Sequence, residues 1–503
     1  MGIKTALSIP YAKFISRQIA KAASNPARAQ RRVLRMLINT GKKTAFGRDH
    51  NFGHIHDYES FKSRVPVRDY EALKPYVDRS VAGELDVLWP GKPLYFCKTS
   101  GTTSGTKFIP ITKNSMPNHI HSARNGLLSY IAETKQTGFV QGKMIFLQGS
   151  PKLNSLDSGV PYGRLSGIVA NHVPTYLLKN RLPSFETNTI EDWETKVDAI
   201  VEETKDQNMT LISGIPSWVQ MYFEKLIEVT GKETIKDIFP NFSLFVYGGV
   251  NYDPYRANFE RLIGKSIPSI ELYPASEGFI AYQDSQKEEG MLLVMNSGIY
   301  YEFIPADEYY KDNRTRLCLE DVKLGTQYAV ILNTNAGLWG YDIGDTVKFV
   351  SLNPPRIKVT GRIKHFTSAF GEHVIGEEVE EAMRQTTQKF GLVVSEFHVA
   401  PQTNPETGLP YHEWLVEGDA IAFPDEAITF MDKLMQEQNV YYKDLLDGNI
   451  LDRLKITALA PDSFNSYMKS KGKLGGQNKV PRLANDRKIA DELIALQAAI
   501  PNN

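Results

Sequence analysis

The run Thr99-Ser100-Gly101-Thr102-Thr103-Ser104-Gly105-Thr106-Lys107 combines small hydroxyl side chains, two glycines and a terminal lysine. Apolar segments flank it at 94–97 and 108–111, and their composition predicts two β-strands that this loop joins. Glycines let a backbone approach a ligand closely and turn its N–H groups inward, while hydroxyls and a lysine add donors and positive charge. The run suits a polyphosphate, although a solvated hairpin loop has a similar composition.

The loop differs from the most familiar phosphate-binding motif. Gly101 and Gly105 are separated by three residues where that motif has four, Thr106 stands between the second glycine and the lysine, and Phe108 follows in place of Ser or Thr. A P-loop kinase or GTPase is therefore disfavoured. The chain also lacks G-x-G-x-x-G, H-E-x-x-H and zinc-spaced cysteine pairs, which removes the simplest support for a Rossmann dehydrogenase or a zinc hydrolase.

Composition indicates an ordinary globular protein. The 503 residues are 42% hydrophobic and 23% charged, which is enough for about two to four domains. The 58 basic and 58 acidic side chains cancel, so no nucleic-acid partner is expected. Cys97 and Cys318 are far apart in sequence, and we expect free thiols in a reducing cytoplasm.

No segment resembles a signal peptide or an apolar span of transmembrane length, so we expect a cytoplasmic protein without stable membrane insertion. We predict no protein partner. Arginines alternate with aliphatic residues over 27–42, which predicts an amphipathic helix. Such a helix can lie on a membrane surface or pack on its own domain by its aliphatic face, and we favour packing.

A helical start of about 57 residues is followed by a loop-and-strand region to about 112. From there to about 352, short strands and helices alternate, which predicts layered α/β structure. The expected strands include 144–147, 244–247, 291–295, 299–304, 328–332 and 347–350. The expected helices include 113–134, 193–206, 218–230 and 253–263. The prolines of 351–355 indicate either a domain linker or a hairpin turn within one domain.

Three later segments carry groups that complement a phosphate loop. In 271–279, Tyr273 offers an aromatic face for a purine and Glu277 a hard oxygen for Mg²⁺, although a plain polar turn fits as well. Asp345, which we prefer to Asp342, follows a glycine turn and is suited to a ribose diol, although Asp and Gly are also ordinary turn residues. Lys479 lies in the glycine-containing loop 475–482, where a mobile lysine can neutralise a displaced phosphate, although most surface lysines have no such role.

Taken in order, these segments resemble the adenylate-forming superfamily, which includes acyl-CoA synthetases and firefly luciferase. The chain looks most like a microbial form of the auxin-responsive Gretchen Hagen family of acyl acid–amido synthetases. The resemblance covers nearly the whole chain, at 44–52, 99–107, 247–250, 273–278, 301–305, 337–345 and 477–482.

The resemblance implies an α/β adenylate-forming-enzyme fold, with a large N-terminal α/β domain that includes a β-barrel-like part and a small C-terminal α+β domain. It implies an ATP- and acyl-acid-binding domain at 1–350, a linker and hinge at 351–364 and a mobile domain at 365–503. Catalytic roles would fall to Lys107 and Lys479, and Mg²⁺ would bind Glu277. The implied nucleotide-binding residues are Thr99, Ser100, Gly101, Thr102, Thr103, Ser104, Gly248, Gly249, Tyr273, Ser276, Asp345 and Arg362.

Two positions depart from the relatives. The hinge pattern around Gly361-Arg362-Ile363-Lys364 continues in register, with Lys364 at the pivot, but Ser368 stands where the superfamily has a lysine. Asp342 stands where plant members of the family have arginine. A coenzyme A role and plant substrate preferences are therefore not transferred to this chain.

The function that follows is a two-step ligase that uses ATP and Mg²⁺. A carboxylic acid would form an acyl-adenylate and pyrophosphate, and an amine, expected to be an amino acid, would then accept the acyl group. The alternatives are an acyl-CoA synthetase with a thiol acceptor and a non-catalytic sensor of nucleotide or acyl acid. A requirement for a thiol acceptor would distinguish the acyl-CoA synthetase from the amide-forming ligase. ATP binding without pyrophosphate turnover would support the sensor.

Overall fold

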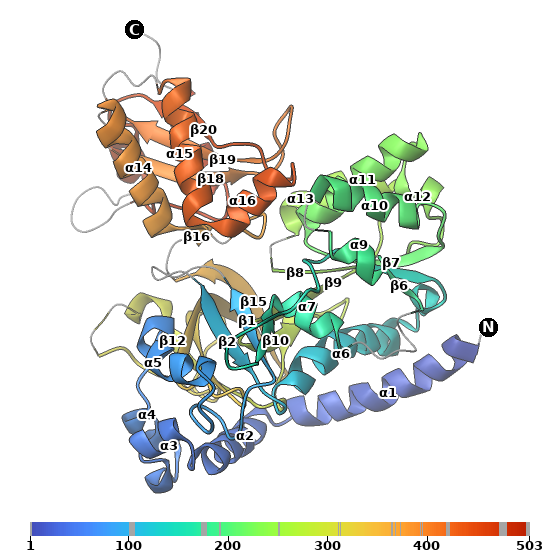
Figure 1. The fold of residues 1–503 in the computed structure, drawn as a ribbon, viewed down its shortest axis with the longest axis vertical. Coiled ribbons are helices and arrows are strands. Elements are labelled where there is room, and N and C mark those ends of the chain that lie inside the picture. The colour runs from blue at the N-terminus through green and yellow to red at the C-terminus, as the bar shows by residue number, and fades with distance from the viewer. Residues whose placement is uncertain are drawn as a thin grey trace.

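The computed structural model describes residues 3–99, 106–172, 179–190, 193–249, 252–309, 311, 313–363, 366–367, 369–372, 374–392, 394, 396–418, 423–471 and 480–498. Within these ranges the chain forms a large body and a smaller C-terminal body, which lies at the top of the view in Figure 1. No helix in the described part combines the length and apolarity that a membrane crossing needs.

An 11-stranded sheet organises the large body, in the order β12-β13-β14-β15-β11-β10-β9-β8-β7-β3-β6. The strands from β9 to β6 are parallel and those from β12 to β10 pair antiparallel. Their bounds are β3 Lys143–Phe146, β6 Arg181–Leu182, β7 Met209–Ser213, β8 Leu244–Gly248, β9 Ser269–Ala275, β10 Gly278–Tyr282, β11 Met291–Leu293, β12 Ile299–Pro305, β13 Gln327–Thr334, β14 Tyr341–Leu352 and β15 Pro355–Arg362. The strands expected from the sequence are all present.

Helices cover both faces of the parallel half (Figure 1). The period of two along a strand sends Ile212 and Phe245 to one face and Leu211 and Leu244 to the other. The first face packs against α10 (Trp193–Thr204), α11 (Pro216–Thr230), α12 (Ile235–Ile238) and α13 (Asp253–Ile263). The second packs against α6 (Met116–Thr134), which itself lies on α1 (Ile3–Ala23). This is the layered α/β arrangement that the alternation predicted.

A second sheet of four strands carries the hydroxyl-rich loop, in the order β2-β1-β5-β4. Its strands are β1 (Tyr95–Thr99), β2 (Lys107–Ile111), β4 (Asn154–Ser155) and β5 (Pro161–Gly163). The shorter elements of the large body are α3 (Ala45–Asp49), η1 (Phe52–His54), α4 (Tyr58–Arg64), α5 (Tyr70–Val81), η2 (Gly138–Val140), α7 (Leu165–Ala170), α9 (Phe185–Asn188) and η3 (Ala306–Glu308).

The arginine-rich helix α2 (Pro26–Gly41) packs on its own domain, as we favoured. Its Val33 and Leu37 are buried in the main core. The buried Gln30 amide donates to the carbonyl oxygens of Met295 and Ile299 at 3.0 Å each and accepts from the N–H of Tyr301 at 2.9 Å. The inner face of α2 is thereby hydrogen-bonded to β12.

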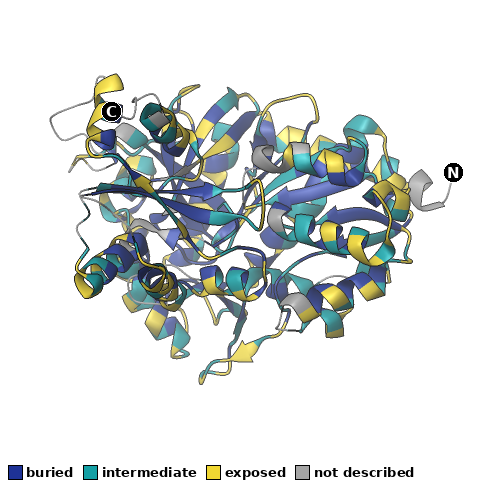
Figure 2. Cartoon of the chain, turned by 90° about the horizontal axis from the view of Figure 1, so that it is seen from above, coloured by how far each residue is buried: buried dark blue, intermediate teal, exposed yellow. Residues whose placement is uncertain are grey.

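The smaller body is built around a three-stranded sheet, in the order β18-β19-β20. Its elements are β16 (Phe366–Thr367), β17 (Val374–Ile375), α14 (Gly376–Phe390), β18 (Glu396–Gln402), β19 (Tyr411–Glu417), α15 (Asp425–Gln438), α16 (Val440–Asp447), β20 (Lys455–Leu459), α17 (Ser463–Ser470) and α18 (Lys488–Ala498). In Figure 2 buried residues gather on the strands, and exposed residues on the outer sides of helices and in loops.

The proline-containing segment 351–355 is the hairpin turn between β14 and β15, where Leu352 pairs with Pro355. Of the two alternatives for this segment, the turn within one domain is the one observed, and the large sheet continues to Arg362. Lys364 and Ser368 lie outside the described residues, so the hinge and the domain limits drawn from it stay predictions.

Candidate functional site

The two strands that flank the hydroxyl-rich run pair antiparallel, as predicted from their composition. Thr99 at the end of β1 pairs with Lys107 at the start of β2. The ammonium of Lys107 lies 5.6 Å from the ring centre of Tyr70 on α5, and the hydroxyl of Tyr70 accepts from the N–H of Phe108 at 2.9 Å. Helix α5 therefore contacts β2 through Tyr70. The predicted phosphate contacts Ser100, Gly101, Thr102, Thr103 and Ser104 lie outside the described residues.

Strand β1 meets the turn between β9 and β10, which carries two further candidates. The thiol of Cys97 donates to the hydroxyl of Ser276 at 3.1 Å. Burial raises the pKa of Cys97 to about 12, and the negative charge of the neighbouring Glu277 adds to the rise. The base of the hydroxyl-rich loop and the candidate metal ligand therefore lie next to each other. Both cysteines are free thiols, as expected.

The hydroxyl of Tyr273 on β9 donates to the Asp345 carboxylate on β14 at 2.6 Å, and both side chains are buried. Three strands separate β9 from β14 in the sheet order. Four inter-strand steps of about 4.8 Å would place the two strands roughly 19 Å apart in a flat sheet, too far for a tyrosine to bridge. The sheet must therefore curl strongly here, as a β-barrel-like part requires, and the curl brings the candidate adenine and ribose residues together.

Asp342, the other acidic residue at the start of β14, has different hydrogen-bond partners. Its carboxylate accepts from the hydroxyl of Tyr309 and, at 2.7 Å, from the N–H of Gly344. It therefore fixes the irregular part of β14 next to Asp345, where the register to β13 shifts and Gly344 has a φ of +78°. The two aspartates that the sequence offered as alternatives therefore have different partners, Tyr273 for Asp345 and Tyr309 with Gly344 for Asp342.

Arg362 and the start of the expected hinge lie beside Asp345, because the two residues pair across β14 and β15. The N–H of Ile363 donates to the carbonyl of Gly344 at 2.8 Å. The backbone that leads to the smaller body therefore leaves the sheet at the candidate ribose residue.

Gly248 and Gly249 end β8 next to the Tyr273 strand. A Cβ at Gly248 would lie 2.4 Å from the carbonyl oxygen of Leu272, so only glycine allows this approach of β8 to β9. Gly249 has a φ of +83°, which strongly favours glycine. These constraints explain why the strand ends in two glycines.

The candidate lysine Lys479 lies outside the described residues, but the segment after it is held in place. His398 Nδ1 donates to the carbonyl of Pro481 at 2.6 Å, and the N–H of Val399 donates to the carbonyl of Arg482 at 2.8 Å. The described residues that follow Lys479 are therefore anchored at the edge of β18.

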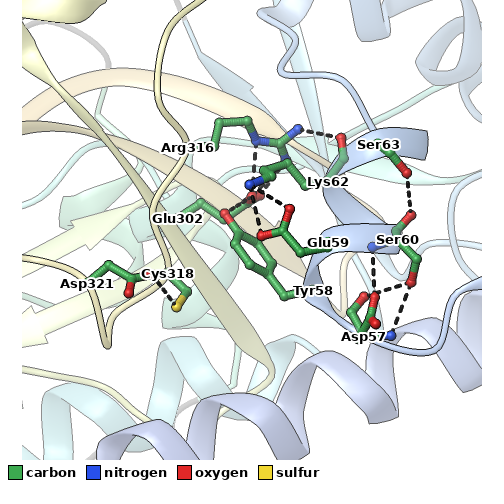
Figure 3. Close-up of polar contacts among 10 residues, drawn as sticks. All are labelled: Asp57, Tyr58, Glu59, Ser60, Lys62, Ser63, Glu302, Arg316, Cys318 and Asp321. Atoms are coloured by element: carbon green, nitrogen blue, oxygen red, sulfur yellow. Dashed lines mark hydrogen bonds and ion pairs between the residues drawn. The ribbon is translucent and has the colours of Figure 1, made fainter.

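Sequence reasoning did not single out the buried cluster around Glu302, which Figure 3 shows. The Glu302 carboxylate is fully buried and receives Arg316 Nε at 3.1 Å and Nη2 at 2.8 Å. It also accepts from the hydroxyl of Tyr58 at 2.9 Å and from the Asn333 amide at 2.8 Å. Asn333 Oδ1 in turn accepts from the N–H of Gly340 at 2.6 Å. The cluster therefore links α4, β12 and β13 to the turn that leads into β14.

The described residues suit a magnesium ion whose oxygen ligands come partly from the protein and partly from a bound substrate. No group of three or more His, Cys, Asp or Glu side chains in the described part is arranged to hold a metal. Magnesium commonly binds through one or two carboxylates together with substrate phosphates. A single Glu277 beside a candidate phosphate-binding loop fits that pattern.

The fold is that of adenylate-forming enzymes. The solved structure of AtGH3.15, an acyl acid amido synthetase in complex with 2,4-DB, superposes with a TM-score of 0.60 at 17% identity and 96% coverage of both chains. A 2-hydroxyisobutyryl-CoA ligase superposes with a TM-score of 0.56 at 15% identity, covering 95% of this chain and 93% of that one.

The sequence places the chain within this class. The GH3 family N-terminal, central and C-terminal domain models match residues 15–192, 292–362 and 377–488, so the chain belongs to the GH3 family. Among its curated relatives in Arabidopsis thaliana, the indole-3-acetic acid-amido synthetase GH3.3 is 21% identical over 93% of this chain and 91% of its own length. The 4-substituted benzoates-glutamate ligase GH3.12 is 23% identical over 93% of this chain and 94% of its own length. The predicted family and fold are confirmed.

Proposed function

We propose that this protein is an ATP-dependent acyl acid–amido synthetase. The observation that carries the proposal is the hydrogen bond between Tyr273 and Asp345, because it joins the two candidate nucleotide-binding residues across a curled sheet. The contact between Cys97 and Ser276 adds the base of the hydroxyl-rich loop to the same region. Membership of a family whose named relatives are acid–amido synthetases supports the reaction type.

The chemistry is a two-step condensation. The substrate carboxylate attacks the α-phosphorus of ATP, and the bond to the β,γ-diphosphate breaks to release pyrophosphate. An amine, proposed to be that of an amino acid, then attacks the acyl carbon and expels AMP. Activation is needed because oxide is a poor leaving group, whereas AMP is a good one.

The chain's own residues position the reactants and balance charge. Tyr273 would flank adenine with Gly248 and Gly249 behind it, while Asp345 would hold the ribose, with Arg362 beside it. The residues 99–104 and Lys107 would contact the phosphates. Lys479 would enter to stabilise the displaced pyrophosphate. A magnesium ion on Glu277 would neutralise phosphate charge when bound. We also propose that the protein is cytoplasmic.

ATP–pyrophosphate exchange tests the first step directly. We expect exchange that depends on Mg²⁺ and on one class of carboxylic acid from a panel of aromatic, indolic and fatty acids. Amino acids and coenzyme A are then supplied together as acceptors, and we expect the amide to be the product. Thioester formation alone would identify an acyl-CoA synthetase, and ATP binding without exchange for any acid would favour a sensor.

A further inference from the structure

Helix α1 presents apolar side chains on two opposite faces. Its inner face, with Ala12 fully buried, packs against α6. Its outer face carries Leu7, Tyr11 and Phe14, which are 68%, 45% and 57% exposed. Spacings of four and three residues place these three side chains on one side of the helix. We call them the outer apolar stripe of α1.

The outer apolar stripe is unusual within this molecule. The other large apolar side chains that are exposed in the described part each stand alone in their own element or loop, as Phe185 does on α9. Single exposed apolar residues are normal, whereas a contiguous set marks a contact surface. In Figure 1, α1 runs along the edge of the molecule beneath α6. The stripe therefore lies on an outer side of the protein.

The charge of this end of the chain indicates what the stripe contacts. The whole chain has no net charge, yet no acidic residue precedes Asp49. Eleven basic residues do: Lys4, Lys13, Arg17, Lys21, Arg28, Arg31, Arg32, Arg35, Lys42, Lys43 and Arg48. Lys13, Arg17 and Lys21 are exposed on α1, and Arg28, Arg32 and Arg35 are exposed on α2, which follows it.

We propose that α1 docks the protein reversibly on an anionic phospholipid surface. An interfacial helix combines an apolar face that enters the headgroup region with lysines and arginines beside the lipid phosphates. The stripe supplies the first part, and Lys13, Arg17 and Lys21 supply the second. A second copy of the chain is a poorer occupant, because two helices without acidic residues would repel each other.

Co-sedimentation of the full chain with lipid vesicles tests the proposal. We expect binding to equimolar phosphatidylcholine–phosphatidylglycerol vesicles that weakens as salt is added, and no binding to phosphatidylcholine vesicles. Leu7→Ser/Phe14→Ser should weaken binding about tenfold or more by removing buried apolar area. Arg17→Glu replaces one positive charge with a negative one and should weaken binding more than about fivefold.

Two matched variants control for general surface effects. Phe185 on α9 is 61% exposed, close to the value for Phe14, and Lys232 is exposed after α11. Phe185→Ser and Lys232→Glu should bind anionic vesicles like the unmodified chain. Circular dichroism and ATP–pyrophosphate exchange in solution should be the same for all four variants, which separates docking from folding and from the proposed reaction.

Three results would overturn the proposal. The first is no sedimentation with anionic vesicles at low salt. The second is binding that the α1 variants leave unaltered. The third is a stable dimer in light scattering that Leu7→Ser/Phe14→Ser dissociates, without any vesicle binding, which would make a second copy the occupant of the stripe.

Discussion

Tyr273 and Asp345 show at the residue scale how two side chains with separate proposed roles depend on each other. The tyrosine hydroxyl donates to the carboxylate at 2.6 Å and so fixes the direction in which the carboxylate faces. A carboxylate offers about four acceptor positions, so this bond is compatible with accepting from a ribose diol as well. The tyrosine would then orient the aspartate in addition to flanking adenine.

Asp345→Ala should lower ATP affinity by about tenfold to a hundredfold, because hydrogen bonds to a charged acceptor contribute about 1.5–3 kcal/mol. Tyr273→Phe keeps the ring and removes only the orienting hydroxyl, so a loss of about fivefold is expected. Titration calorimetry with ATP measures both. Asp342→Asn is the matched control, since Asp342 bonds to Tyr309 and Gly344. Unaltered ATP affinity in Asp345→Ala would contradict the ribose role.

The buried His119 on α6 should make the stability of the fold depend on pH. Burial lowers its pKa from 6.5 to about 4, and Nδ1 has no hydrogen-bond partner among the described residues. The unfolded chain therefore takes up this proton before the folded chain does, so stability is intact above pH 6.5 and falls as pH drops toward 4. The loss should reach about 3 kcal/mol at most, at 1.36 kcal/mol per pKa unit.

His119→Leu should remove that part of the pH dependence, because leucine neither titrates nor needs a hydrogen-bond partner. Urea unfolding at several pH values between about 6.5 and 4 measures it. His54→Leu, at an exposed position, is the matched control. An unchanged slope of stability against pH in His119→Leu would remove His119 as its source.

Elements that are distant in sequence are joined by single buried side chains. Gln30 bonds α2 to β12. Glu302 on β12 accepts from Tyr58 on α4 and from Arg316 (Figure 3). It also accepts from Asn333 on β13. Such a cluster stabilises the packing of its elements only while all partners are present, because a buried charge without its partner lowers the free energy of unfolding. The antiparallel half of the sheet should therefore be sensitive to any one of them.

Arg316→Met should destabilise the protein by about 3–5 kcal/mol, since it leaves the Glu302 carboxylate buried without its cation. Glu302→Gln/Arg316→Met should be closer to the unmodified stability, because no buried charge then remains. Denaturant unfolding followed by circular dichroism measures both variants. Arg384→Met, whose partner Glu381 is on the surface, is the control and should leave stability nearly unchanged. Equal effects at Arg316 and Arg384 would contradict the role given to the cluster.

Contacts between the two bodies set the arrangement of the whole molecule. Arg164, just before α7, donates to Asp444 on α16, and its guanidinium lies 4.9 Å from the ring centre of Tyr441. A Cβ at Gly371 would lie 3.1 Å from Ile215 Cδ1, so the chain passes close to the large body there as well. Because Gly163 on β5 pairs with Cys97, Arg164 also stands near the strand that carries the hydroxyl-rich loop.

If the smaller body turns between the two half-reactions, Arg164–Asp444 stabilises only the arrangement seen here. Asp444→Asn should therefore change the rates of pyrophosphate exchange and of amide formation by different factors, each about two- to fivefold for a partly exposed ion pair. Arg164→Asp/Asp444→Arg should restore part of the original ratio. Rapid-quench measurement of both steps decides this. Equal changes in both rates would show that the pair does not distinguish the two states.

The sequence by itself determined the local features of this protein. The composition of 94–111 was sufficient to predict two strands and their loop, and the aliphatic positions of 27–42 predicted the packed face of α2. Periodicity and turn residues act over a few residues, so they can be read without knowing the rest of the fold. The order of short motifs along the chain also identified the family, which the domain models confirm.

Only the tertiary structure decided which distant side chains meet. Tyr273 and Asp345 are 72 positions apart and Cys97 and Ser276 are 179 apart, and both pairs form because the sheet curls and the hairpin lies across it. The partners of Glu302 and the exposure of the outer side of α1 depend in the same way on what packs beside each element. Neither sheet curvature nor the packing of distant segments has a local signature, because both arise from the balance of contacts over the whole core.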